Sequence, residues 1–231
     1  KILITGGAGN IASSLAKKLS DLNYQIVILD NLLTGSLKKI PKDINTIFVE
    51  GDANKKGVLS EIFKTHEFDY VFHYAAVVGV ERTINNPISV LEDIKGIKNI
   101  LVLSREYNVK RVFFSSSSEV YGEPFEIPQN EITTPLNSRL PYAIVKNVGE
   151  AYCRSFQKEY GLPYTIFRFF NTYGPNQSND FVIPKFLNLA LQNKNITIYG
   201  SGSQTRTFCY IDDNVDTCIK ILQKNLHLND V

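Results

Sequence analysis

The sequence contains no methionine, only three cysteines and only three histidines among its 231 residues. The cysteines (Cys153, Cys209 and Cys218) are an odd number without a C-x-x-C pair, and the histidines lie far apart in the sequence. Neither set has the spacing of a metal site or of a disulfide framework, so we expect no metal and a reducing compartment, the cytoplasm. Because even the first residue is not methionine, we also expect the gene product to begin at least one residue earlier.

Long apolar runs and a charge excess of one sign are also lacking. No run approaches the ~20 apolar residues of a membrane-spanning helix, and the chain starts on the short apolar run Lys1–Thr5 rather than on a signal peptide. The 25 basic and 23 acidic residues are interspersed, without the basic stripe that nucleic-acid binding requires. We therefore expect neither a membrane nor a nucleic acid as partner. With 43% hydrophobic and 11% aromatic residues, disorder is excluded as well.

Short apolar runs alternate with longer segments of helical periodicity through the first three quarters of the chain. The runs are rich in Val, Ile, Phe and Tyr, as are strands buried on both faces, and they cover Lys1–Thr5, Gln25–Asp30, Thr46–Glu50, Asp69–Tyr74, Arg111–Ser115 and Tyr164–Phe169. Apolar residues at steps of three and four predict helices over Ile11–Leu22, Gly57–Thr65, Ile88–Tyr107 and Tyr142–Tyr160. This alternation predicts an α/β fold with a doubly wound parallel sheet.

The pattern changes after Phe170. The expected elements are a loop over Asn171–Pro175, a helix over Phe181–Gln192, a short strand over Ile196–Tyr199, a strand up to Ile211 and a helix that starts near Asp212. This is too little chain for a second independent core. We therefore expect a nucleotide-binding domain over residues 1–169 and part of a smaller lobe over residues 170–231.

A glycine-rich turn joins the first expected strand to the first expected helix. In Thr5–Ala12, the glycines Gly6, Gly7 and Gly9 allow the backbone to approach a pyrophosphate, and the helix N-terminus offers free N–H groups. Asp30 ends the second strand about 20 residues later, as recognition of a ribose by a carboxylate requires. Since a carboxylate binds a 2′-hydroxyl and repels a 2′-phosphate, Asp30 favours NAD over NADP.

Tyr142 and Lys146 lie about one helical turn apart, so both side chains project from one face of the expected helix. The ammonium can then stabilise a phenolate and lower the pKa of the tyrosine toward the value of a general base. Ser115–Ser118 follow the fifth expected strand, at the sheet edge where open α/β sheets bind ligands. Asp52, beyond the third strand, fits either a hydrogen bond to an adenine or a solvated loop carboxylate.

These motifs together resemble extended short-chain dehydrogenases/reductases, in the NAD-dependent nucleotide-sugar epimerase/dehydratase family. The resemblance covers the whole length, through Thr5–Gly9, Leu29–Asn31, His73–Ala76, Ser115–Gly122, Tyr142–Lys146, Arg168–Pro175 and Gly200–Phe208. It implies a Rossmann domain with NAD, a nucleotide-sugar substrate, and a homodimer with a four-helix bundle formed by Ile88–Tyr107 and Tyr142–Tyr160 of each subunit. Because similar enzymes are longer, it also implies that the C-terminal substrate-binding lobe is incomplete.

The resemblance implies a role for each matching residue. Tyr142 is expected to remove the C4-hydroxyl proton of the sugar as the C4 hydride passes to NAD⁺, while Ser117 hydrogen-bonds the same oxygen and Lys146 holds the nicotinamide ribose. Asn171 and Arg206 match contacts to the substrate diphosphate, although Arg206 also fits an exposed loop arginine. The cofactor contacts that it implies, besides Tyr142 and Lys146, are Gly6, Gly9, Asn10, Ile11, Asp30, Asn31, Asp52, Ala53, Tyr74, Ala75, Ala76, Asp93, Ser115 and Phe169. Asp93 stands where relatives frequently have an asparagine.

Glu119 bears on the step that follows the 4-keto sugar common to the family. Similar dehydratases carry an acidic residue here that removes the C5 proton, UDP-glucuronate decarboxylases also carry Ser-Glu, and most 4-epimerases have a neutral residue. We therefore expect dehydratase or decarboxylase chemistry slightly ahead of C4 epimerisation, with a surface carboxylate bound to a loop N–H as the alternative for Glu119. Ser118 argues against a dehydratase, which pairs the glutamate with an aspartate, and Arg139 fits a decarboxylase or an exposed loop. An NAD-binding regulatory protein and a structural subunit are the non-enzyme alternatives.

Overall fold

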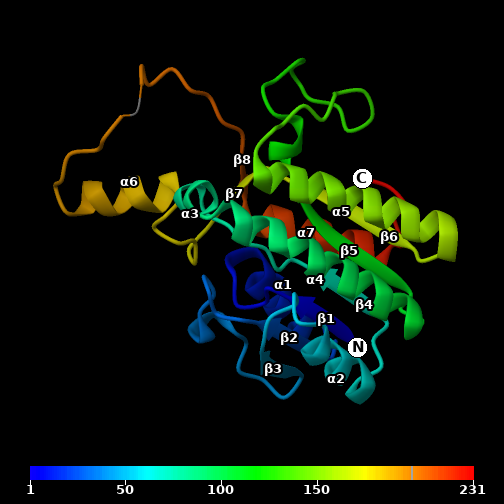
Figure 1. Ribbon diagram of the computed structural model, residues 1–231. Helices are drawn as coiled ribbons and strands as arrows, with labels where there is room; N and C mark the ends of the chain where they lie inside the picture. The colour runs from blue at the N-terminus through cyan, green and yellow to red at the C-terminus, as the bar shows by residue number, and fades with distance from the viewer. Residues whose placement is uncertain (199) are drawn as a thin grey trace.

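A parallel sheet forms the centre of the structure, a computed structural model that describes residues 1–198 and 200–231 (Figure 1). Its strands are β1 (Ile2–Thr5), β2 (Ile26–Asp30), β3 (Thr46–Glu50), β4 (Tyr70–His73), β5 (Arg111–Ser117) and β6 (Tyr164–Phe169). They lie in the order β3-β2-β1-β4-β5-β6, and every neighbouring pair is parallel. This confirms the doubly wound sheet, whose order reverses between β1 and β4 and leaves a crevice there for a ligand.

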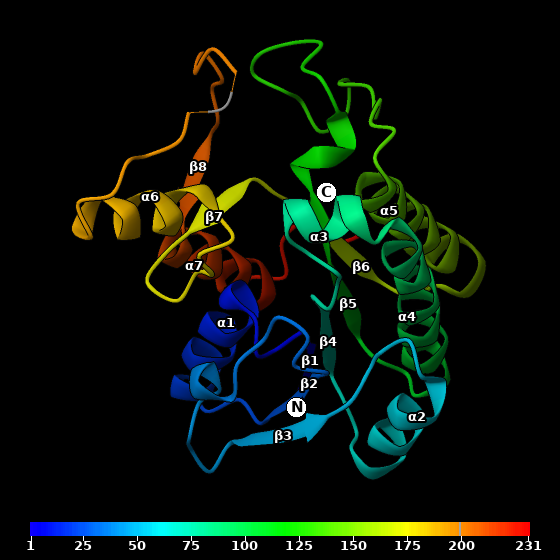
Figure 2. The same ribbon diagram turned by 60° about the vertical axis from the view of Figure 1, so that its left-hand side comes forward.

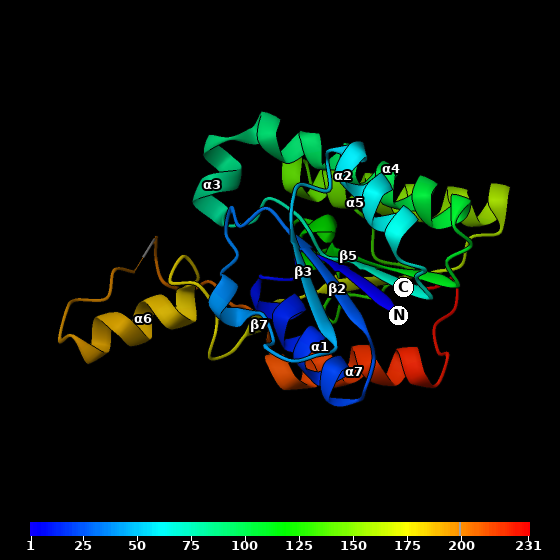
Figure 3. The ribbon, with the colours of Figure 1, turned by 90° about the horizontal axis from the view of Figure 1, so that it is seen from below.

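Helices cover both faces of the sheet (Figure 3). One face carries α1 (Asn10–Asp21) and α7 (Ile211–Gln223), and the other carries α2 (Lys56–Thr65), α4 (Pro87–Glu106) and α5 (Pro141–Tyr160). Successive residues of a strand pack against opposite helix layers, because side chains alternate between the two faces of the sheet. On β5, for example, Phe113 packs in the cluster with α1 and α7, and Phe114 packs in the cluster with α4 and α5.

The serine run lies differently from the prediction. β5 continues to Ser117 instead of ending at Ser115, so the expectation that the serines beyond Ser115 follow the strand was wrong for Ser116 and Ser117. The backbones of Ser115–Ser117 pair with Phe167–Phe169 of β6, and this pairing outweighs the low strand preference of serine. Ser118 begins a 3₁₀ helix, η2 (Ser118–Tyr121), which was not predicted. Two further short elements were also not predicted, η1 (Leu37–Lys39) and α3 (Val80–Asn85).

The region after Phe169 departs furthest from the predictions. β7 (Asn171–Tyr173), where a loop was expected, pairs in parallel with β8 (Phe208–Tyr210) in a small second sheet. The predicted helix is confirmed as α6 (Val182–Leu191), which stands apart from the layers of the main sheet (Figures 1 and 2). The strand predicted over Ile196–Tyr199 was wrong for residues 196–198, which are exposed and have no face to bury, and Tyr199 lies outside the described residues.

The last part of the chain returns to the main sheet. α7 packs against α1, and the following segment runs beside β6, where the Asn229 N–H donates to the Tyr164 carbonyl at 2.8 Å and the Ile166 N–H donates to the Asp230 carbonyl at 2.9 Å. Part of the range expected in the smaller lobe thus packs on the nucleotide-binding domain. No helix in the described part of the chain has both the length and the apolar character needed to span a bilayer.

Candidate active site

A cleft of about 1090 Å³ runs along the carboxyl ends of the parallel strands. This volume exceeds the roughly 300–1000 Å³ of most small-molecule sites, so the cleft has room for a dinucleotide and a second ligand. Of the expected site residues, the cleft lining includes Gly6, Gly9, Asn10, Ile11, Asp30, Asn31, Asp52, Ala53, Tyr74, Ala75, Ala76, Asp93, Ser115, Ser117, Glu119, Tyr142, Lys146, Phe169 and Asn171. Arg206 is outside this lining; it is exposed and donates to the carbonyl of Thr205.

The glycine-rich turn after β1 is suited to hold a pyrophosphate. Gly6 has a φ of +69°, and a Cβ on it would lie 2.7 Å from the backbone nitrogen of Ala75, so only glycine fits. α1 begins after Gly9 with no side-chain cap and no acidic residue in its first turn, which leaves its N-terminal N–H groups open to an anion. Beside them, the buried Oδ1 of Asn10 has no hydrogen-bond partner within the described structure. This unpaired polar atom fits a bound nucleotide.

Asp30 fixes the turn and faces the same cleft. Its Oδ2 accepts the N–H of Ala8 at 2.9 Å, and its Oδ1 accepts the N–H of Leu32 at 2.7 Å. A carboxylate has about four acceptor sites, so Asp30 can still accept hydrogen bonds from ribose hydroxyls. Lys39, which the sequence analysis missed, also lines the cleft; burial lowers the pKa of Lys39, while the charge of Asp30 acts to raise it. The sequence shows that Lys39 follows Asp30, but the 3₁₀ helix η1 that contains Lys39 was not predicted.

Asp93 and Asp52 hold the loops after β3 and β4, which line the cleft. Asp93 Oδ2 accepts the N–H of Val77 at 2.7 Å and Oδ1 accepts the Asn54 side-chain amide at 3.2 Å, which joins the loops after β3 and β4. Burial raises the pKa of Asp93, against the effect of these hydrogen bonds and of the positive charge of Lys146. Asp52 accepts the N–H of Asn54 at 2.8 Å, so it is a turn residue that also faces the cleft.

Tyr142 and Lys146 extend from the first two turns of α5 toward the serines of β5. The buried Lys146 Nζ donates to Ser115 Oγ at 3.4 Å and lies 5.6 Å from the centroid of the Tyr142 ring. Ser117 Oγ accepts the N–H of Glu119 at 3.2 Å, which links the last residue of β5 to the first turn of η2. The four predicted residues, Ser117, Glu119, Tyr142 and Lys146, are thus brought together in one cleft.

The protein environment shifts the pKa values of this pair in opposite directions. Burial raises the pKa of Tyr142 to about 12; hydrogen bonding to Ser117 lowers it in part, and the charges of Glu119 and Asp93 add to the rise. Burial lowers the pKa of Lys146 to about 8, against the effect of Asp93. The expected lowering of the tyrosine pKa was therefore wrong for the protein alone, because removing the phenolate from water outweighs the hydrogen bond with Ser117.

The residues expected at the sugar end are more scattered. Glu119 is exposed and lines the cleft. Asn171 lines it as well and donates from Nδ2 to the Thr207 carbonyl at 2.9 Å, one residue after Arg206. Arg139 is exposed and is not among the lining residues, which favours its alternative as a loop arginine.

Residues 2–230 match the NAD dependent epimerase/dehydratase family. The chain belongs to this family. Over 218 residues it is 38% identical to a putative UDP-glucose 4-epimerase of Methanocaldococcus jannaschii, a match that covers 92% of this chain and 70% of the relative. It is 35% identical to a UDP-N-acetyl-alpha-D-glucosaminuronate decarboxylase of Bacillus cytotoxicus, covering 98% and 72%, and 36% identical to a dTDP-D-glucose 4,6-dehydratase of Dictyostelium discoideum, covering 97% and 56%.

Solved structures support the same assignment. A UDP-glucose 4-epimerase of Thermotoga maritima with UDP-glucose superposes with a TM-score of 0.92 at 32% identity, covering 96% of this chain and 73% of that one. A dTDP-glucose 4,6-dehydratase of Streptomyces venezuelae with NAD bound gives 0.89 at 29% identity, covering 96% and 71%. The predicted family, fold class and cofactor of this epimerase/dehydratase family member are thereby confirmed.

The cleft of this family member also contains His73, whose motif was noted without a role for the side chain. Its Nδ1 shares a hydrogen bond of 2.7 Å with Thr5 Oγ1, which also accepts the N–H of Ala75 at 3.2 Å. Burial lowers the pKa of His73 to about 3, and the charge of Lys146 adds to this effect. His73 is therefore a neutral ring that fixes the crevice between β1 and β4.

Arg82 on α3 is a second lining residue that was missed. Its Nη1 donates to the Val78 carbonyl at 2.7 Å, and its Nη2 lies 3.8 Å from a carboxylate oxygen of Asp180. It therefore spans the cleft between the main sheet and the segment before α6. No sequence signal identified it, because α3 itself was not predicted.

Proposed function

We propose that this family member oxidises C4 of a nucleotide sugar with NAD⁺ and then removes water or carbon dioxide from the 4-keto sugar. The observation that carries this proposal is that Glu119 shares one cleft with Tyr142, Lys146 and Ser117, beside a turn suited to a pyrophosphate. Tyr142, Lys146 and Ser117 place a base, a cation and a hydroxyl together, and Glu119 adds a carboxylate for a second proton.

NAD would lie along the cleft with its pyrophosphate on the turn of Gly6 and Gly9, and its adenosine ribose on Asp30. Lys146 would hold the nicotinamide ribose, and Asp52 the adenine. The nicotinamide ring supplies a hydride acceptor for C4. The other expected contacts that line the cleft complete this site.

Tyr142 would take the proton of the C4 hydroxyl, with Ser117 bound to the same oxygen. A base with a pKa of about 12 needs a nearby positive charge to act at neutral pH. Lys146, with a pKa of about 8, is mostly protonated at pH 7 and supplies that charge within 5.6 Å of the ring centroid. Once C4 is a ketone, the C5 proton is acidic, and Glu119 would remove it in a dehydratase.

A 4-epimerase is the second candidate. It is supported by the 38% identity to the Methanocaldococcus protein and by the TM-score of 0.92 with the Thermotoga enzyme. In this case Glu119 would take no proton, and its backbone contact with Ser117 Oγ would be its only role in the site.

Three further proposals complete this picture. The part of residues 170–231 that does not pack on the nucleotide-binding domain would contribute to the sugar-binding lobe, and the cytoplasm would be the compartment. A homodimer would form through α4 and α5, which pack against each other and leave Ile88, Leu91 and Ile144 exposed to 71, 37 and 41%. A monomer mass in light scattering would contradict the dimer.

The reaction is tested by incubating the protein and NAD⁺ with a panel of nucleotide sugars in D₂O, followed by NMR and mass spectrometry. Deuterium at C5 with loss of water establishes a dehydratase, and loss of carbon dioxide from a uronate establishes a decarboxylase. An unlabelled product inverted at C4 means an epimerase. If NAD is bound but no sugar reacts, the regulatory alternative replaces the proposal. Glu119→Gln is the matching variant, since it removes the carboxylate and keeps the side-chain size.

A further inference from the structure

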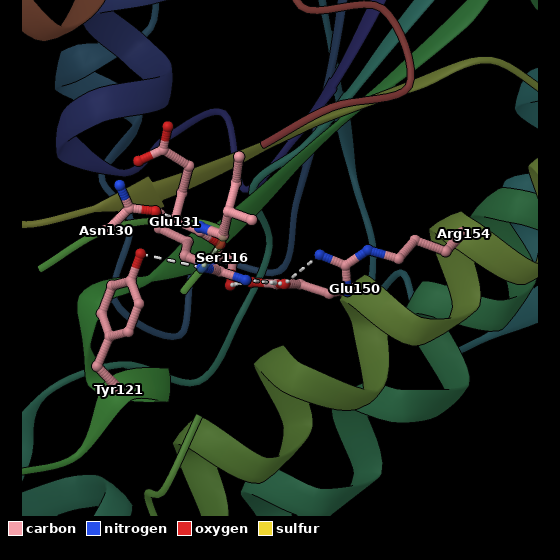
Figure 4. A network of polar contacts seen from close by, with 8 residues as sticks. Ser116, Tyr121, Asn130, Glu131, Glu150 and Arg154 are labelled. Carbon is pink, nitrogen blue, oxygen red and sulfur yellow. Dashed lines mark hydrogen bonds and ion pairs between the residues drawn. The ribbon is translucent and has the colours of Figure 1, made fainter. Parts of the chain in front are cut away.

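Glu150 and Arg168 form a buried ion pair next to Ser116 of β5, on the side of the sheet covered by α5 (Figure 4). Ser116 and Arg168 are register partners on β5 and β6, and both donate to Glu150 of α5. Ser116 Oγ lies 2.6 Å from Oε1, Arg168 Nε lies 2.8 Å from Oε1, and Arg168 Nη2 lies 2.7 Å from Oε2. Glu150 is fully buried and comes one helical turn after Lys146.

The remaining nitrogen of Arg168 reaches the segment that carries Glu119. Nη1 donates to the Tyr121 hydroxyl at 2.9 Å and to the Glu131 carbonyl at 3.0 Å. Tyr121 is the last residue of η2 and is buried, so Glu119 lies two residues from this contact on the same short helix. Glu131 belongs to residues 122–140, which lead directly into α5 and Tyr142. Arg168 thus bonds the catalytic helix at one end and the η2 segment at the other.

The ion pair between Glu150 and Arg168 is better suited to fixing the orientation of the two groups than to adding stability. Burial acts to raise the pKa of Glu150, yet the hydrogen bonds and charge of Arg168 and the hydrogen bond of Ser116 keep it below its usual value, so the carboxylate is ionised. A buried ion pair often adds little net stability over apolar residues of equal size. The planar guanidinium, however, binds a carboxylate through two parallel hydrogen bonds and so fixes the orientation of both groups.

We propose that Arg168 is a positioning residue that fixes η2 and residues 122–140 on α5, and thereby sets the placement of Glu119 relative to Tyr142. The inference rests on the proposed function for its effect on turnover. The anchoring itself rests on the contacts of Arg168 with Glu150, Tyr121 and Glu131.

Two variants weaken this link, and a third leaves it intact. Tyr121→Phe removes the hydroxyl that Arg168 holds but keeps the ion pair with Glu150. Arg154→Gln is the matched control, since Arg154 is half-exposed and donates to Glu150 Oε2 at 3.1 Å from the outside. Arg168→Lys keeps the charge but loses the two-pronged contact; if it fails to fold, Tyr121→Phe decides alone.

Hydrogen–deuterium exchange of the NAD-loaded protein tests the anchor without turnover. We expect exchange in peptides of residues 118–140 to be about fivefold faster in Tyr121→Phe, as the loss of one hydrogen bond predicts. Arg168→Lys should show a larger increase, and Arg154→Gln should match the wild type. Unchanged exchange in the first two variants overturns the proposal.

Steady-state kinetics then separate positioning from a merely structural role. In Tyr121→Phe we expect kcat to fall about fivefold, while KM for the sugar nucleotide and the NAD content stay at wild-type values. Faster exchange with an unchanged kcat would overturn the positioning role. If the wild type converts no sugar, the proposed function fails, and the exchange result alone decides whether Arg168 anchors η2.

Discussion

The cleft is built in different ways at the glycine-rich turn, here called the cofactor end, and at the segment from Asn171 to α6, here called the sugar end. At the cofactor end, β1 and β2 are buried along their whole lengths, and Asp30 accepts the N–H of Ala8 in the glycine-rich turn. At the sugar end, α6 has no buried residue, and Leu187 and Leu191 are 58 and 81% exposed. Segments with few buried apolar contacts open at low free energy, so the cofactor end should be the more rigid of the two. The residues predicted to be catalytic line the same cleft, where α5 meets β5.

The largest effect is expected at that junction. Tyr142→Phe removes only the phenol hydroxyl, so turnover should fall by roughly 10²–10⁴ while NAD binding and folding stay unchanged. Turnover of a reactive sugar nucleotide and the absorbance of bound cofactor measure the two effects separately. Tyr160→Phe, at the exposed end of the same helix, is the control and should retain full activity. Near-normal turnover of Tyr142→Phe would remove the role assigned to this residue.

The next effect tests whether the cofactor end is as tightly built as its geometry indicates. Gly6→Ala places a Cβ 2.7 Å from the Ala75 nitrogen, so NAD affinity should fall by more than about tenfold, the equivalent of 1.4 kcal/mol. Gly161→Ala is the control, since Gly161 also has a positive φ, of +71°, but its Cβ would meet no atom within 4 Å. It should lower the free energy of unfolding by about 1 kcal/mol and leave NAD affinity unchanged. Equal losses of affinity in isothermal titration would contradict the close approach at Gly6.

The same contrast explains what the sequence could predict. The strands of the main sheet were predictable because burial on both faces demands continuous runs of Val, Ile and Phe, as in Ile26–Asp30. Most of the residues predicted for the cofactor do line the cleft, because glycines and a strand-end carboxylate have backbone reasons for their positions. β7 and α3 were missed because three or six residues carry too little periodicity. The Arg168–Glu150 contact depends on how α5 packs on β6, which no local pattern reveals.

A fall in pH should lower the free energy of unfolding through His73, which lies at the cofactor end. Its pKa is about 3 in the folded protein and near 6.5 in the unfolded chain, so the unfolded chain binds more protons between these values. The contribution of His73 to stability is therefore complete above about pH 6.5 and is lost as the pH falls toward 3, by up to a few kcal/mol. Urea unfolding at several pH values should show this slope, and His73→Gln should reduce it. An equal slope in both proteins would assign the acid sensitivity to other groups.

The smallest effect on the free energy of unfolding is expected at the sugar end. It decides whether α6 is as exposed in solution as it is in the structure. Leu191→Gln changes a side chain that is 81% exposed, so the free energy of unfolding should change by less than about 0.5 kcal/mol. Leu15→Ala, in the fully buried face of α1, should cost about 2–5 kcal/mol in the same urea titration. A loss in Leu191→Gln close to that of Leu15→Ala would mean that α6 is covered in solution. The sugar end would then be as closed as the cofactor end, and substrate entry would require α6 to move.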